Sequence, residues 1–356
     1  MPSNASYPTP SGAAAPVSGL ASAVGQTILV VGIISGLDLS SYYTPFPISS
    51  IASAATLFGT GETVRVIAEI QRQGAPAINA IVLQDESELP SLFDYLTDVA
   101  FDILVPVRLA ATRARGLLFG NFAYLREQTG QAISIVMPAV PHGLGGGTLL
   151  GPSLIDPTVI LDRYFVRTLD MLTINPNVPS QYTADAAPSV AGVMARSLPS
   201  VAITNKTLYG VRALGATYAD VQALPLANTG FTTLRQTIRH GLVPYLGITA
   251  TSVTPGDLNY SPSFHKLSTL RTCQYVVTLI QNATRWLIGG TATMQVQGIV
   301  SRLLAGLQRS GVILAYDSTI TIAQVAGAIT MSLNLLPPYE TTMQTVSTSV
   351  TTLGTS

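Results

Sequence analysis

Charged side chains are scarce in this sequence of 356 residues. Only 10% of the residues are Asp, Glu, Lys or Arg, whereas a typical soluble domain has about 25%. Hydrophobic residues make up 47%, so a monomer has few charges with which to keep its surface solvated. This composition favours either a membrane protein or a subunit whose surface is largely buried against partners.

Long hydrophobic runs are also lacking. The most apolar N-terminal run, Ile28 to Ile34, reads ILVVGII, which is far shorter than the roughly 20 residues that a membrane-spanning helix needs. Pro, Gly or Arg interrupts the other apolar stretches, and the sequence predicts no secretory signal. Packing of subunits in a large assembly therefore explains the scarcity of charge better than stable membrane insertion does.

Excess charge of one sign and paired cysteines are absent too. The 18 basic and 18 acidic residues give a net charge of zero, which argues against nucleic acid as the main partner. A single cysteine, Cys273, excludes internal disulfides and thiolate metal clusters. Because Cys273 falls on the apolar face of an expected helix, we interpret it as a small buried hydrophobic residue and not as a reactive thiol.

Groups arranged for catalysis are missing from the sequence. The three histidines, His142, His240 and His265, are far apart and show no metal-ligand spacing. No G-x-S-x-G nucleophile elbow occurs. The acidic run Asp85 to Glu88 lies where a strand passes into a helix, a common position for carboxylates. We therefore expect no catalytic residue, no metal site, no cofactor and no enzymatic activity.

The glycine-rich stretch HGLGGGTLLG, residues 142 to 151, is the one candidate ligand loop. It lacks the Gly-Lys-Ser/Thr ending of a P-loop, and no helix follows the glycines as the dinucleotide fingerprint requires. We interpret it as a surface loop. The alternative, an α/β enzyme or nucleotide-binding protein that uses this loop, remains open at this point.

Apolar strands alternate with helical segments in the first part of the chain. We expect strands at 26–35, 77–83, 101–107 and 132–140, separated by helical segments at 50–74 (broken at Gly59 and Gly61), 86–97 and 112–128. In the last of these helices, Leu118, Phe122 and Leu125 are expected to point inward. Continuously apolar strands between helices predict an α/β fold with a mainly parallel sheet covered on both faces.

The pattern changes after about residue 230, where two amphipathic helices are expected. The first has one apolar face, listed as Leu270, Cys273, Val277, Ile280, Thr284 and Leu287, and the second has Val296, Val300, Leu303 and Leu307 and ends near Gly311. Residues 326 to 338 are expected to form one strand. Arg302 and Arg309 lie away from the apolar face of the second helix, where they form either a solvated surface or a cationic strip for an acidic partner.

The central stretch PSVAGVMARSLPSVAITNKTLYGVRALG, Pro188 to Gly215, resembles the sheath protein of contractile phage tails and related injection machines. The segments FHKLSTLRTCQYVVTLIQNATRWLIGG and VSRLLAGLQRSGVI are similar to the long helices of that family's C-terminal domain. The order and spacing of these segments along the chain extend the resemblance over roughly residues 26–345. It implies an N-terminal arm (1–25), a subtilisin-like α/β sheath domain (26–229), a smaller α+β C-terminal sheath domain (230–341) and a C-terminal arm (342–356).

The resemblance also implies a function and a set of partners. Sheath subunits polymerise helically around an inner tail tube protein and contract to drive the tube through the envelope of a target cell. The expected partners are further copies of the chain, the inner tube, and baseplate and tail terminator proteins, in a virion tail assembled in the host cytoplasm. The resemblance suggests that Arg302 and Arg309 face the tube. A tube or capsid component is a third interpretation, although tube subunits are normally smaller and all-β.

The two arms are suited to strand exchange between subunits. Residues 342–356 are rich in Thr, Ser and Val and contain no charged side chain, so they can form a strand without burying charge. We expect Thr345, Val346, Ser347 and Val350 to add a strand to the sheet of a neighbouring subunit.

Overall fold

A seven-stranded sheet lies at the centre of the computed structural model, which describes residues 25–97, 99–139, 159, 161–215, 217–284, 293–317, 321–325 and 328–338. The strand order is β10–β6–β5–β4–β1–β3–β2. The strands are β1 (Thr27–Ile33), β2 (Phe46–Pro47), β3 (Ala77–Leu83), β4 (Ile103–Pro106), β5 (Ser134–Pro138), β6 (Phe165–Thr168) and β10 (Phe231–Thr232). Neighbours run parallel except β2, which is antiparallel to β3. The predicted mainly parallel sheet is confirmed.

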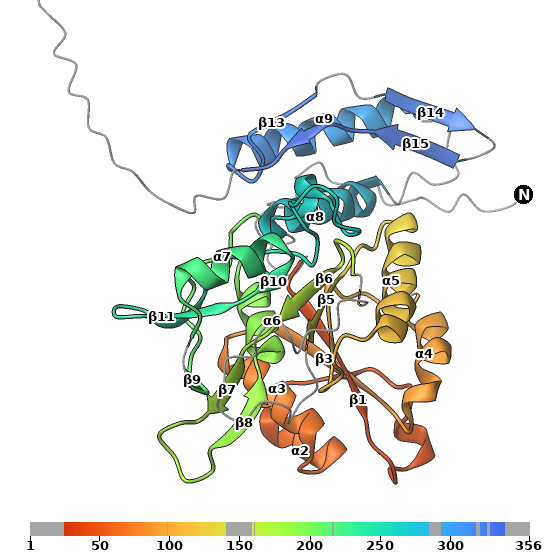
Figure 1. Ribbon diagram of the computed structural model, residues 1–356. Coiled ribbons are helices and arrows are strands. Elements are labelled where there is room, and N and C mark those ends of the chain that lie inside the picture. The colour runs from red at the N-terminus through yellow and green to blue at the C-terminus, as the bar shows by residue number, and fades with distance from the viewer. Residues whose placement is uncertain are drawn as a thin grey trace, which may run out of the picture.

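Helices cover both faces of this sheet (Figure 1). Alternate residues of β1 show why its sequence is continuously apolar: Ile28 and Val30 belong to the hydrophobic cluster on one face, and Leu29 and Val31 to the cluster on the other. The helices of this part of the chain are η1 (Leu39–Ser41), α2 (Ile51–Phe58), α3 (Glu62–Arg72), η2 (Glu86–Glu88), α4 (Leu89–Leu96), α5 (Arg113–Gln128), α6 (Ala187–Arg196) and α7 (Asp220–Asn228).

The small residues of α6 are explained by close packing. Every residue from Ala187 to Ala195 is buried. A Cβ atom built at Gly192 would lie 2.6 Å from the Cβ of Gln73 and 2.9 Å from the carbonyl oxygen of Ile70, so α6 approaches α3 too closely for a side chain there. The bland composition of this central segment therefore serves packing and not chemistry.

The inward face of α5 differs from the expected one. Leu118 is partly buried and Phe122 is buried, as predicted, but Leu125 is 55% exposed. Arg126, only 2% exposed, is buried instead. Its guanidinium donates to the carbonyl oxygens of Leu96 at 2.5 Å and Val99 at 3.0 Å. An arginine whose donors are satisfied by carbonyls can occupy a core position, and a pattern based on apolar residues alone cannot detect it.

Helix α8 (Leu267–Thr284) lies between two layers (Figure 1). Leu267 packs in the cluster of the main sheet, whereas Val276 and Ile280 pack against α9 (Thr293–Arg309). Contacts on two sides spread the buried positions around the helix, so the expectation of a single apolar face was wrong for Val277, which is 40% exposed. Cys273 is half-buried, and burial raises the pKa of its thiol.

The chain after α8 forms a separate layer of α9 and short strands. Val296, Val300 and Leu307 of α9 are buried as predicted, and Gly311 ends the helix region with φ = 74°. The expected single strand at 326–338 was wrong. That range contains two strands, β15 (Ala328–Ser332) and β16 (Leu335–Leu336). They pair antiparallel with two earlier strands, β15 with β14 (Thr321–Val325) and β16 with β13 (Ala315–Tyr316).

Two further sheets complete the described part of the chain. β7 (Met171–Ile174), β8 (Tyr182–Asp185) and β9 (Val211–Ala213) form a sheet in the order β8–β7–β9. β11 (Leu234–Thr237) and β12 (Gly241–Pro244) form a hairpin, and η4 (Pro262–Phe264) precedes α8. The β11–β12 hairpin projects from the side of the molecule opposite α4 and α5 (Figure 1).

Candidate functional sites

The carboxyl ends of β1 and β4 mark the position where an open α/β sheet usually binds its ligand. Strands lead away from β1 in both directions in the sheet order, so the topological switch point lies between these two strands. Arg108 lies two residues after the end of β4 at this point, with an unusual φ of 54°. If the chain were an α/β enzyme, this crevice would be the first place to expect its active site.

A buried ionic cluster occupies that crevice. The guanidinium of Arg108 donates from Nε to Glu62 Oε2 at 3.0 Å, from Nη2 to Glu69 Oε1 at 2.5 Å and from Nη1 to Asp185 Oδ2 at 3.0 Å. The hydroxyl of Tyr182 also donates to Glu69, at 3.1 Å. Only 8% of the Arg108 side chain and none of the Glu69 side chain are exposed. The protein's own side chains therefore take up the donors and acceptors that a ligand would need.

Burial has the largest effect on the pKa values of Glu69 and Arg108 in this cluster. It raises the pKa of Glu69 to about 7, even though Arg108 opposes the shift. Burial alone would lower the pKa of Arg108, but Asp185 and Glu69 together raise it above its usual value. The guanidinium thus stays charged, and it joins α3, β8 and the segment after β4. The arrangement is that of a structural cross-link.

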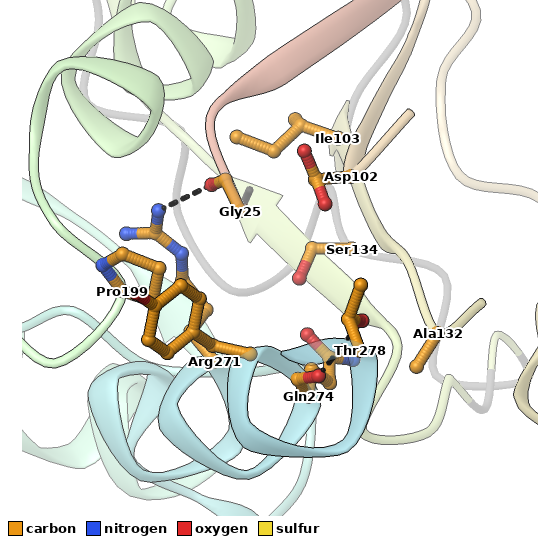
Figure 2. A pocket seen from close by; sticks show the side chains of 10 residues that line it. Gly25, Asp102, Ile103, Ala132, Ser134, Pro199, Arg271, Gln274 and Thr278 are labelled. Atoms are coloured by element: carbon orange, nitrogen blue, oxygen red, sulfur yellow. Dashed lines mark hydrogen bonds between the residues drawn. The ribbon is translucent and has the colours of Figure 1, made fainter. Parts of the chain in front are cut away.

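A small pocket lies at the opposite, amino-terminal edge of the sheet (Figure 2). Its lining includes Gly25, Asp102, Ser134 and Arg271, and it has room for about one water molecule. Arg271, from α8, donates to the carbonyl oxygens of Gly25 at 2.9 Å and Ser197 at 3.1 Å. Burial lowers the pKa of Arg271 to about 10, so it remains protonated at neutral pH. This pocket anchors α8 to the start of β1 and is too small for a metabolite.

Asp170 is a second buried acid, at the carboxyl end of β6. It is 8% exposed, and its Oδ2 accepts a hydrogen bond from the amide of Leu234 at 2.9 Å. Burial raises its pKa from 3.8 to about 7. The folded state thus holds a proton that the unfolded chain releases near pH 4, so this group's contribution to stability is complete below pH 4 and is lost as the pH rises through 7.

Replacement of Asp170 should flatten the pH dependence of stability. We expect Asp170→Asn to gain about 2 kcal/mol relative to the wild type between pH 5 and pH 8, because Asn cannot ionise but can still accept from Leu234. Urea unfolding of dilute protein at the two pH values measures the difference. The exposed Asp94→Asn is the control and should show no gain, and an equal pH slope in the wild type and Asp170→Asn would contradict the assignment.

The residues proposed from the sequence are partly within the described chain. Arg302 and Arg309 are exposed on α9, and each Nε donates to a carbonyl of its own helix, Gly298 at 3.2 Å and Ala305 at 3.3 Å. Outside the described residues lie four arm positions, one histidine and the glycine-rich loop, namely Thr345, Val346, Ser347, Val350, His142 and residues 142–151.

The two remaining histidines are in unrelated environments. His240 is exposed at the tip of the β11–β12 hairpin, whereas His265 is 5% exposed and its Nδ1 lies 2.8 Å from the carbonyl oxygen of Thr251. Within the described ranges, no group of three or more His, Cys, Asp or Glu side chains is arranged to hold a metal ion. Nor does any helix in those ranges have the length and hydrophobicity needed to cross a membrane.

Sequence reasoning missed Arg108, Asp170 and Arg271, the residues that hold the buried polar sites. A signal was present for Arg108, which follows an apolar strand that the pattern predicts, since polar residues at the carboxyl ends of parallel strands gather at one edge. Asp170 follows β6, a strand that the pattern did not predict. Arg271 had no such signal, because a helical arginine between apolar residues is ordinarily on a solvated face.

The β14–β15 hairpin is a candidate surface for assembly. It is a sheet of only two strands, and among the described residues neither of its outer edges is paired. In Figure 1 it lies beside α9, at the end of the molecule away from β7 and β8. Unpaired strand edges present backbone amides and carbonyls to an incoming strand.

Comparisons with known proteins identify the fold. No family profile matches the sequence, and neither does any curated protein. Among solved structures, a chain of the anti-feeding prophage baseplate aligns with a TM-score of 0.70 and 14% identity, over 93% of this chain and 94% of that one. The sheath of an extracellular contractile injection system, PVC, in its contracted state gives 0.69 and 13% identity, over 91% of both chains.

A phage-type sheath protein gives the same result. The sheath tail protein from Listeria innocua aligns with a TM-score of 0.62 and 11% identity, over 88% of this chain and 95% of that one. The similarity extends over nearly the whole of each chain, so it includes the parallel sheet as well as the layer of α8 and α9. The chain has the fold of contractile sheath proteins, as its sequence predicted.

Proposed function

We propose that this chain is the structural subunit of a contractile sheath, which polymerises helically around an inner tube and contracts to drive that tube through the envelope of a target cell. The observation that carries the proposal is the whole-chain similarity to sheath proteins. The low charge content supports it, because subunits buried against neighbours need few charges to remain solvated.

The proposed organisation assigns a role to each part of the chain. The body around the parallel sheet corresponds to the subtilisin-like sheath domain, without protease chemistry. The layer of α9 and β13 to β16 corresponds to the smaller α+β C-terminal domain, and residues 1–25 and 342–356 are the arms. The pairing of β10 with β6 and the anchoring of α8 by Arg271 favour a boundary after α8 over one at residues 229 and 230.

Neighbouring subunits are joined by strand exchange in this proposal. The C-terminal arm of one subunit, through Thr345, Val346, Ser347 and Val350, adds a strand to an outer edge of the β14–β15 sheet of the next. Main-chain hydrogen bonds of such an added strand do not depend on side-chain identity, so they can persist while the bodies of the subunits rotate. Two unpaired edges in the described hairpin support this arrangement.

The partners and the location follow from the same proposal. The assembly would contain the inner tube, with baseplate and tail terminator proteins at its ends. The particle would be a virion tail or a phage-derived injection machine, assembled in the host cytoplasm. The chain needs no cofactor or nucleic acid in this role.

The alternative function is that of an α/β enzyme or nucleotide-binding protein. The Arg108 cluster argues against it, because it fills the crevice where such a protein would bind its ligand. A nucleotide titration followed by thermal unfolding tests the alternative, since a ligand that binds the native state must raise the melting temperature. A saturable rise would favour the enzyme.

Negative-stain electron microscopy of the purified protein tests the proposed function directly. A sheath subunit is expected to form hollow cylinders without any other protein. A chain that stays monomeric over a wide range of concentration and salt would contradict the proposal.

Arg302 and Arg309 are proposed to contact the inner tube in the extended sheath. Each sheltered contact with a carboxylate contributes about 1.5–3 kcal/mol, and repetition along the tube makes the total large. The double variant Arg302→Glu and Arg309→Glu should therefore yield tube-free contracted sheaths in place of extended sheaths on tube. Micrographs of assembled particles measure the ratio of the two forms, and extended particles at normal yield would show that both residues are merely solvated.

A further inference from the structure

The tip of the β11–β12 hairpin is an ordered, exposed and partly apolar projection. Ile238 at the tip is fully exposed, at 106% of its reference area, and Arg239 and His240 beside it are exposed as well. The turn is held by hydrogen bonds from the Thr237 hydroxyl to the Gly241 carbonyl and from the His240 amide to the Thr237 hydroxyl, both 3.1 Å. A preformed tip with a solvated isoleucine has the properties of a docking element.

The same hairpin carries positive charge along its side. Asn205 donates to the Pro244 carbonyl at 3.0 Å, so the exposed Lys206 next to it lies alongside β12. Arg235 of β11 donates to the side chain of Asn205 at 2.6 Å. Arg239 and Lys206 have no acidic partner within the part of the chain that the structure describes, so two cations remain available to another molecule.

A complementary acidic face is formed by η2 and α4. Asp85 and Asp94 are exposed, Glu88 is half-exposed, and none of the three has a basic partner in the described ranges. The amide of Ser87 donates to Asp85 at 2.8 Å and lowers its pKa, which keeps that carboxylate ionised. Tyr95, 48% exposed, lies next to Asp94 and gives the face an apolar element.

These two surfaces lie on opposite sides of the molecule, so one chain cannot bring them together. In Figure 1 the β11 hairpin projects to the left, whereas α4 lies at the right-hand side beyond the sheet. Two different patches of one chain that fit each other produce a head-to-tail contact between copies. Repetition of that contact gives a ring or an open helix, depending on the rotation at each step.

We propose that the hairpin tip of one copy docks on the η2–α4 face of the next copy of this chain. In this contact Arg239 and Lys206 meet the carboxylates of Asp85, Glu88 and Asp94, and Ile238 packs on Tyr95. The inference rests on the proposed sheath function and specifies one lateral contact within it. The overall charge of zero is consistent with it, because the positive and negative patches of identical subunits neutralise each other in the assembly.

A disulfide between two different single-cysteine variants tests the contact. Both variants carry Cys273→Ser, and one has Ile238→Cys while the other has Tyr95→Cys, all positions at which no core side chain is lost. Mild oxidation of the mixture should give disulfide-linked dimers, whereas neither variant alone should give any. Both cysteines in one chain should give a ladder of covalent polymers. Disulfide-linked dimers from Ile238→Cys alone would overturn the proposal. So would chains that polymerise although no disulfide forms between the cysteines at positions 238 and 95.

Charge reversal provides an independent test of the same contact. Arg239→Glu and Asp94→Arg should each raise the protein concentration needed for polymerisation by about tenfold, because an attraction becomes a repulsion in every repeat. Both changes in one chain should restore it to within about threefold. Arg212→Glu, an equal change of charge at an exposed position of β9 outside the proposed contact, is the control. Failure of the double variant to recover would refute the pairing.

The outcomes separate this inference from the proposed function. If the wild-type chain forms cylinders but the 238–95 link and the charge-swap recovery are both absent, the sheath function stands and this contact is wrong. If the wild type forms no cylinders yet the mixed variants still cross-link, the contact stands and the sheath function is wrong.

Discussion

A chain that ends at residue 341 is expected to fold as the full chain does but to form no cylinders. The hydrophobic clusters of the described chain end with Leu335, and residues 342–356 are mostly Thr and Ser, a composition with few large apolar side chains for a core. The β14–β15 sheet, by contrast, has two strands of five residues each, and no other described strand pairs with its edges. Each main-chain hydrogen bond that an arm would add contributes about 1 kcal/mol, and assembly loses all of them at every subunit.

Circular dichroism, urea unfolding and negative-stain microscopy of the truncated chain together measure this result. The free energy of unfolding should stay within about 1 kcal/mol of the full-length value. A double variant tests whether the arm must pair as a strand or need only be present. Val346→Pro with Val350→Pro should also prevent assembly, because proline lacks the amide donor. Val346→Thr with Val350→Thr is the matched control and should assemble. Normal cylinders from the truncated chain would show that the arm is dispensable.

Replacement of Arg108 by methionine is expected to cost about 3–5 kcal/mol of stability. The change removes a guanidinium that pairs with Glu62, Glu69 and Asp185 at once, and the buried carboxylates of Glu69 and Asp185 both lose this cation. Urea unfolding of dilute protein at pH 8, where Glu69 is ionised, should show the largest loss. The loss should be smaller at pH 5, because Glu69, whose pKa is about 7, is then protonated and no longer buries a negative charge.

A neighbouring arginine supplies the control for this prediction. Arg65 also pairs with Glu62, but its side chain is 50% exposed. Arg65→Met should therefore cost less than about 1 kcal/mol, as exposed ion pairs usually do. If Arg108→Met costs no more than Arg65→Met, the cluster does not cross-link the crevice as we describe.

The central sheet could be predicted from the sequence because its strands are buried on both faces. Residues such as Ile28 to Val31 are apolar without interruption, and helices with glycine or charged ends separate them. Prediction from the sequence failed where a buried side chain is polar, and where a helix packs against other elements on two sides. Arg126 lies in the core because carbonyl groups satisfy it, and α8 lies between two layers, so Val277 is exposed although the spacing favours burial.

The candidate sites were less accessible to prediction than the fold. The Arg108 cluster joins residues that are up to 123 positions apart, between Glu62 and Asp185, and their proximity depends on the order of strands in the sheet. The β14–β15 hairpin was missed because a short strand with Thr, Ile and Gln has no distinctive period. The acidic and basic patches of the proposed lateral contact are each ordinary in sequence. They become informative only when the fold puts them on opposite sides of one molecule.

The hydrogen bond from Arg271 to the Gly25 carbonyl would have a mechanical consequence if the chain works as the proposed sheath subunit. A pull applied at the amino-terminal end of β1, along the axis of the strand, loads a strand that is hydrogen-bonded to β3 on one side and β4 on the other. Such a load shears the two ladders, so their bonds resist together, unlike the strands of a hairpin peeled apart one pair at a time. Because Arg271 also holds the Gly25 carbonyl from α8, part of the tension passes directly into the layer that contains α9. The start of β1 is thus tied to two layers, and in the proposed sheath we expect a stretched assembly to separate between subunits before a subunit unfolds.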